Sequence, residues 1–172
     1  IYSQIDRIIV GSATPAGKAL KLTAGDELRA AYFLERREMG VINIGGKGTM
    51  TLDGVRYDFD YKDGIYIGMG TKDVIFESAD AENPAKFYFN SAPAHKTYPT
   101  VFINPEKDIL PENKKELGCL ENANHRTIRK YILPGQVESC QLEMGMTALE
   151  PGSVWNTMPC HTHDRRMEVY LY

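Results

Sequence analysis

Two histidines and one glutamate close to the last residue have the spacing of a metal site. His161 and His163 are two positions apart, so on a β-strand both side chains point to the same face. On a helix the same side chains would diverge by about 200°. Glu168 lies an odd number of positions further on, and a turn through residues 164–166 would bring it back on a neighbouring strand. Two imidazoles and a carboxylate would then converge, which suits a divalent cation and leaves at least one coordination position open.

Other interpretations of this stretch stay open. A surface hairpin with solvated histidines and a charged turn has the same pattern, because short motifs also match by chance. Arg165 and Arg166 adjoin the ligands, and the planar arginine fork fits a substrate carboxylate, although arginines in turns usually face solvent and gain little from pairing there. Cys160 falls on the opposite face of such a strand from His161, which favours a small buried side chain over a ligand.

The elements that would position these residues are short strands. The clearest signal is at residues 49–59, where apolar and polar residues alternate on both sides of Asp53-Gly54, and this predicts a β-hairpin with a type I′ turn. A helical turn is expected at 112–117, inside a proline-punctuated stretch at 92–124. Further strands are expected at residues 5–10, 28–34, 41–44, 64–68, 74–78, 87–90, 126–133, 141–149 and 167–172. Short strands between polar turns predict an all-β sandwich or barrel.

Composition limits the classes of function. The formal net charge of −3 offers no basic field for nucleic acid, and no apolar run is long enough for a transmembrane helix. The three cysteines are an odd number without C-x-x-C spacing, which disfavours a disulfide framework and favours the cytoplasm. The chain starts at Ile1 without a methionine or a signal peptide and stops inside an expected strand, so we expect a piece of a longer protein.

The C-terminal stretch also resembles a known family. Gly152 followed by His161-x-His163-x4-Glu168 is similar to the first conserved motif of the cupins. The run MPCHTHDRRMEVY at 158–170, with GMGTKD at 68–73, resembles one branch of them, the 5-keto-4-deoxyuronate isomerases. More residues separate Gly152 from His161 than in a typical cupin, which favours this branch. The resemblance extends over essentially the whole chain.

The resemblance implies a tandem of two cupin-like antiparallel β-barrels (a bicupin). Residues 1–95 would form a first domain without a metal site, because this half has no H-x-H, and residues 96–125 would connect it to the second. Residues 126–172 would begin a second barrel, incomplete in this chain, that binds zinc through the histidine pair and Glu168. A further histidine ligand would lie beyond Tyr172. The resemblance also implies a uronate substrate in pectin breakdown and a homo-oligomer, a hexamer.

Three functions remain open at this stage. A ketol-isomerase would interconvert 5-keto-4-deoxyuronate and 3-deoxy-2,5-diketogluconate, with a divalent cation stabilising the negative charge that develops as a proton moves between adjacent carbons. Two histidines and a carboxylate are also the ligands of non-haem iron oxygenases. A non-catalytic sugar-binding cupin is the third possibility. Because Glu168 lies four residues from the end of the printed sequence, we expect this chain by itself to be a poor catalyst or none.

Overall fold

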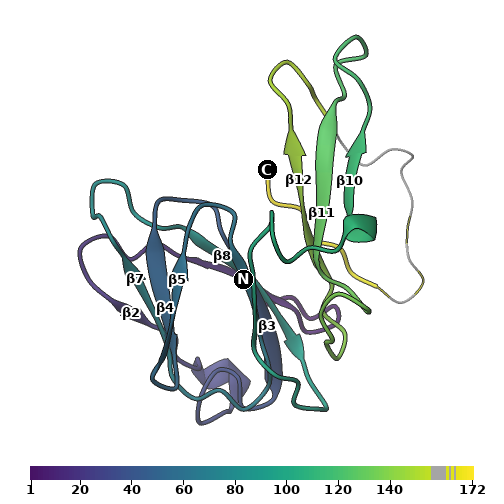
Figure 1. The fold of residues 1–172 in the computed structure, drawn as a ribbon. Coiled ribbons are helices and arrows are strands. Elements are labelled where there is room, and N and C mark those ends of the chain that lie inside the picture. Colours follow the sequence, from purple (N-terminus) through teal and green to yellow (C-terminus); the bar gives the residue numbers. More distant parts are fainter. Residues whose placement is uncertain (156–161, 163, 165) are drawn as a thin grey trace.

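The computed structural model describes residues 1–155, 162, 164 and 166–172 (Figure 1). In this part of the chain the regular secondary structure is almost entirely strand, and the strands form three antiparallel sheets. This confirms the all-β prediction. Figure 1 shows the four-stranded sheet on one side, the five-stranded sheet in the middle, and the three-stranded sheet above and to the right.

We name the sheets A, B and C. In spatial order, sheet A consists of β1 (Ile9–Ala13), β8 (Phe87–Pro93), β3 (Arg37–Asn43), β6 (Gly64–Ile67) and β9 (Val101–Ile103). Sheet B consists of β2 (Leu20–Lys21), β7 (Val74–Ser78), β4 (Gly48–Leu52) and β5 (Val55–Phe59). Sheet C consists of β10 (Lys114–Leu117), β11 (Arg126–Ile132) and β12 (Met144–Leu149). Two short 3₁₀ helices, η1 (Asp26–Leu28) and η2 (Pro111–Asn113), complete the regular structure of the described residues.

The hairpin predicted at residues 49–59 is confirmed. β4 pairs with β5 in the expected register, with Leu52 opposite Val55. Asp53 has a φ of 46° and Gly54 a φ of 85°. Positive φ at both central residues is what a type I′ turn requires.

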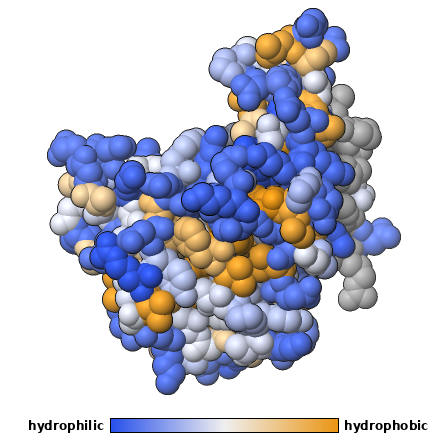
Figure 2. Space-filling view, in the orientation of Figure 1, coloured by the Kyte–Doolittle hydropathy of each residue, from blue (hydrophilic) through white to orange (hydrophobic). Residues whose placement is uncertain are grey.

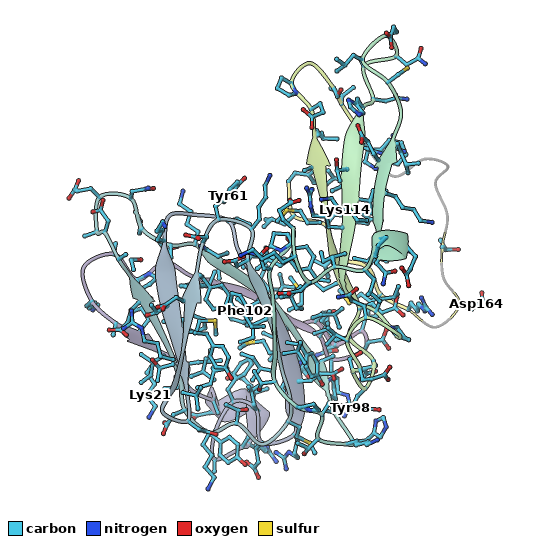
Figure 3. The ribbon with its side chains drawn as sticks, viewed as in Figure 1. Lys21, Tyr61, Tyr98, Phe102, Lys114 and Asp164 are labelled. Atoms are coloured by element: carbon cyan, nitrogen blue, oxygen red, sulfur yellow. The ribbon has the colours of Figure 1, made fainter. Side chains whose placement is uncertain are left out.

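Sheets A and B pack face to face and enclose the larger core. Alternation along β3 sends Met39 and Val41 into this core, where they are at most 1% exposed. Aromatic side chains fill much of the space between the sheets. Phe102, labelled in Figure 3, comes from β9 and lies edge-on against Phe59 of β5, with ring centroids 5.1 Å apart.

Sheet C covers the other face of sheet A, so β3 is buried on both sides. Ile42 of β3 joins Tyr131 and Leu142 in this second core. Gly40 allows sheet C to pack close to sheet A, because a Cβ at this position would lie 2.6 Å from Cδ1 of Ile132. Figure 2 shows apolar side chains gathered over the middle of the visible face, with hydrophilic side chains directly above them.

Several expected elements differ from the structure. The strand expected at 5–10 begins only at Ile9, because Asp6 and Arg7 are left-handed with φ values of 50° and 52°. Residues 28–34 form no strand, because Arg29 is left-handed with a φ of 45° and Phe33 and Leu34 enter the core from turns. The helical turn expected at 112–117 is limited to η2, and the chain continues as β10.

Part of the proline-punctuated stretch belongs to a sheet. β9 lies inside the segment expected to connect two domains, yet it pairs with β6 at the edge of sheet A. The division of the chain at residues 95/96 and 125/126 stays a prediction.

Candidate active site

A cavity of about 750 Å³ opens where the C-terminal segment runs back beside β12. Figure 1 shows this segment in yellow, next to the three-stranded sheet. One face of sheet A, the strand β12 and residues 166–172 supply the walls. Among the described site candidates, Arg166 and Glu168 both line this cavity.

Glu168 is held by its own segment. Its Oε2 accepts a hydrogen bond from the hydroxyl of Tyr170 at 2.9 Å, and the ring of Tyr170 stacks on that of Tyr172 with centroids 6.2 Å apart. These three side chains therefore lie on one side of an extended chain, as the alternating pattern predicts. The strand expected at 167–172 is nevertheless absent from the described residues, because no neighbouring backbone pairs with this segment there.

Arg166 is ion-paired at the cavity. Its Nη1 lies 3.4 Å from Oε2 of Glu143, with the two side chains 65% and 43% exposed. An exposed pair of this kind contributes little to stability, so the guanidinium is available to a ligand at low cost. Its role in substrate binding stays a prediction, and Arg165 lies outside the described residues.

His161, His163 and Cys160 also lie outside the described residues. Within residues 1–155, 162, 164 and 166–172, no group of three or more His, Cys, Asp or Glu side chains is placed to hold a metal ion. The ligand set therefore stays a prediction.

The charges around the cavity favour a cation. Asp6, Glu143 and Glu168 line the cavity, against the one described arginine there, Arg166. A surplus of carboxylates attracts a divalent cation and repels a free anion. Glu168, the described member of the predicted ligand set, thus lies in surroundings that suit a metal ion, which would offset this negative charge.

Two polar residues of the cavity wall were not anticipated from the sequence. On β8, Phe87 and Phe89 belong to the larger core, whereas Tyr88 and Asn90 alternate with them and line the cavity. The Tyr88 hydroxyl donates to Oδ1 of Asn90 at 3.2 Å. Burial raises the pKa of Tyr88, so its phenol stays protonated near neutral pH. The Phe-Tyr-Phe-Asn alternation was the signal that could have identified both.

The other two histidines lie away from this cavity. Nε2 of His125 is 2.6 Å from Oε1 of Glu116. His95 is exposed and lines a different cavity.

Comparison with known proteins gives strong similarity along the chain. Residues 1–171 match the KduI/IolB family. A 4-deoxy-L-threo-5-hexosulose-uronate ketol-isomerase from Lachnoclostridium phytofermentans is 73% identical over 172 residues, which is all of this chain and 61% of that protein. A protein of the same name from Escherichia coli is 53% identical over 174 aligned residues, again covering 61% of its length. The chain thus spans about three fifths of the relatives it matches.

Similarity to a solved structure supports the fold. An IolB-like protein from Salmonella typhimurium superposes with a TM-score of 0.54 at 14% identity, over 77% of this chain and 47% of that chain. Identity at this level supports the fold alone.

In the part of the chain that the structure describes, no helix has the length and apolar character needed to cross a membrane.

Proposed function

The chain belongs to the KduI/IolB family, and from this we propose that it forms part of a metal-dependent ketol-isomerase. The proposed reaction interconverts 5-keto-4-deoxyuronate and 3-deoxy-2,5-diketogluconate in pectin or uronate breakdown. The observation that carries this proposal is the 73% identity, over every residue of this chain, to a protein named as a 4-deoxy-L-threo-5-hexosulose-uronate ketol-isomerase.

The residues that would hold the metal are His161, His163 and Glu168, and zinc is the proposed ion. When bound, a divalent cation would act as a Lewis acid toward the oxygens of the substrate. The surplus of carboxylates around the cavity supports this assignment, because a substrate that is itself an anion would otherwise be repelled.

Residues of the chain would bind and orient the substrate. The guanidinium of Arg166, with that of Arg165, would take the uronate carboxylate, for which the planar fork is suited. Tyr88 and Asn90 of β8 offer uncharged hydrogen-bonding groups for the hydroxyls of the sugar. The reaction moves a proton from a hydroxyl-bearing carbon to the neighbouring carbonyl carbon, with a compensating proton shift between their oxygens, so no redox cofactor is needed.

The family also suggests how the whole protein is built. We propose a tandem of cupin-like barrels, in which sheets A and B form the first and sheet C begins the second. We further propose a homo-oligomer, a hexamer, that acts in the cytoplasm.

An assay of the full-length protein tests the function. Purified protein would be incubated with the proposed uronate substrate with and without oxygen, and the product identified by mass and chromatography. The isomerase predicts a product of unchanged mass and a rate that does not depend on oxygen. Turnover that requires oxygen would favour the oxygenase instead. Absence of turnover with fully metallated protein, but retained sugar binding, would favour a binding protein.

A further inference from the structure

A second cavity, of about 520 Å³, lies where the N-terminal residues and the η1 region meet the start of β3 and the end of β8. Its lining is rich in cationic side chains. Arg7, Arg36 and Arg37 line it, together with the exposed His95. Glu27 is the single carboxylate among the described lining residues. This concentration of positive charge stands out in a chain whose net charge is −3.

Arg37 is the fixed point of this cavity. Arg37 is only 6% exposed. Nε donates to Oγ of Ser91 at 3.1 Å, and Nη2 donates to the backbone oxygens of Ser91 and Arg7, both at 2.7 Å. Nη1 has no hydrogen-bond partner among the described residues. The guanidinium is thus held rigidly by neutral groups, with one nitrogen left for another acceptor.

No carboxylate of the described residues pairs with Arg37. Burial of an unpaired cation is costly, and here it lowers the pKa of Arg37 to about 10, with nearby Arg7 acting in the same direction. Side chains with perturbed pKa values cluster at functional sites, and an anionic ligand would supply the charge that Arg37 lacks.

Arg7 and Arg36 are presented to the same cavity by the backbone. Asp6 and Arg7 have φ values of 50° and 52°, a left-handed pair that turns the chain over Arg37. The guanidinium of Arg7 makes no hydrogen bond or ion pair with any described residue. Arg36 is anchored over the η1 region, because its Nη2 donates to the backbone oxygens of Leu28 and Arg29 at 3.1 and 2.7 Å.

We propose that this cavity is a binding site for the oxyanion group of a small molecule, a carboxylate or a phosphate, held by Arg7, Arg36 and Arg37. Several guanidiniums around one pocket suit such a group, since their forked donors match its oxygens. The cavity has the size of ordinary small-molecule sites. Gln141 lines both this cavity and the proposed active site, so the two are neighbours with separate cationic residues.

Calorimetric titration of the full-length protein tests the proposal. The probes are sodium phosphate and sodium glucuronate, each at constant low ionic strength so that screening does not mask the interaction. The variant is Arg7→Gln, because the Arg7 guanidinium makes no hydrogen bond or ion pair with the described residues and its loss should leave the fold intact. The matched control is Arg56→Gln on β5, an exposed arginine outside the cavity that is paired with Asp58.

We expect saturable binding of at least one anion, weakened about tenfold or more by Arg7→Gln and unchanged by Arg56→Gln. The anion that binds more tightly identifies the source of the oxyanion group. The proposal is overturned when neither anion binds saturably, or when Arg7→Gln binds as tightly as Arg56→Gln. Glucuronate binding that Arg7→Gln leaves intact and Arg166→Gln removes belongs to the other cavity and also overturns it. Because no outcome uses turnover, failure here is distinguishable from failure of the isomerase assignment.

Discussion

The carboxylate of Glu38 accepts a hydrogen bond from the backbone nitrogen of Leu142 at 2.8 Å, which joins β3 to the segment before β12 across 104 positions of sequence. The same carboxylate accepts from the backbone nitrogens of Cys140 and Gln141, at 2.7 and 2.8 Å, and from the hydroxyl of Tyr66 at 2.7 Å. Glu38 is 0% exposed. A buried acid therefore fixes sheet C, and the segment that leads to the candidate active site, against sheet A.

Replacing Glu38 with glutamine should destabilise the protein by about 3 kcal/mol, because an amide cannot accept all four hydrogen bonds and turns its own donors toward backbone donors. Chemical denaturation of the full-length protein measures this loss. The control is Glu77→Gln on β7, an exposed position, where we expect a change within about 0.5 kcal/mol. Equal effects of the two substitutions would contradict the role given to Glu38.

Gly40→Ala tests the close approach of sheets A and C. The new Cβ would lie 2.6 Å from Cδ1 of Ile132 and 2.9 Å from Sδ of Met144. We expect destabilisation of about 1–3 kcal/mol, as for other overpacked cores. Gly25→Ala is the comparison, since its Cβ would meet only the flexible carboxylate of Glu27. A thermal unfolding experiment in which both variants melt together would argue against tight packing at Gly40.

Tyr131 should make stability depend on pH in the alkaline range. It is 1% exposed, its hydroxyl donates to the backbone oxygen of Lys62 at 2.7 Å, and burial raises its pKa. The unfolded chain, with an ordinary tyrosine pKa of about 10, loses its proton first as the pH rises. The stabilising contribution is thus fully present below about pH 10 and is lost as the pH rises toward the pKa of the folded protein.

Denaturation at neutral and alkaline pH checks this expectation. Tyr131→Phe should cost about 1 kcal/mol near neutral pH through its lost hydrogen bond. The difference from wild type should narrow above about pH 10, because phenylalanine does not titrate. Tyr61→Phe, at a position 60% exposed, should show no such narrowing. A constant difference for Tyr131→Phe across the whole range would show that its ionisation is not coupled to folding.

Local patterns were enough to predict the all-β class and the 49–59 hairpin, because turn type and alternation are encoded in adjacent residues. The strand expected at 28–34 was wrong because Phe33 and Leu34 are buried by tertiary packing without backbone pairing. Tertiary contacts also explain why the role of Glu38 was not predicted from the sequence. Its partners lie more than a hundred residues away, and no nearby spacing marks them. At the candidate site, the alternation from Glu168 to Tyr172 was foreseen, whereas the contribution of β8 depended on the packing of sheet C.

Arg166→Gln should weaken substrate binding in the full-length protein more than it slows turnover. The side chain lies at the cavity and, among the described residues, is paired with the half-exposed Glu143. Loss of a charge-assisted hydrogen bond to a carboxylate predicts a rise in KM of about tenfold or more, with kcat changed much less. Steady-state kinetics on the uronate measure both. Lys115→Gln on β10, exposed and outside this cavity, is the control. A variant with unchanged KM would remove Arg166 from the substrate site.

The proposed metal site is tested by measuring the metal content of the full-length protein. We expect about one divalent cation per chain, lost when His161 or His163 is changed to alanine. Glu168→Gln should reduce occupancy, because an amide oxygen is a weaker ligand than a carboxylate for such ions.

The hydrogen bond from Tyr170 to Glu168 offers a second test of the metal site, since it orients the Glu168 carboxylate although Tyr170 is not itself a proposed ligand. Tyr170→Phe should therefore lower metal affinity by about tenfold while leaving the ligands in place. His95→Ala is the control, because His95 is exposed and lines the other cavity. Full occupancy in the double variant His161→Ala/His163→Ala, measured by elemental analysis, would rule out the assignment.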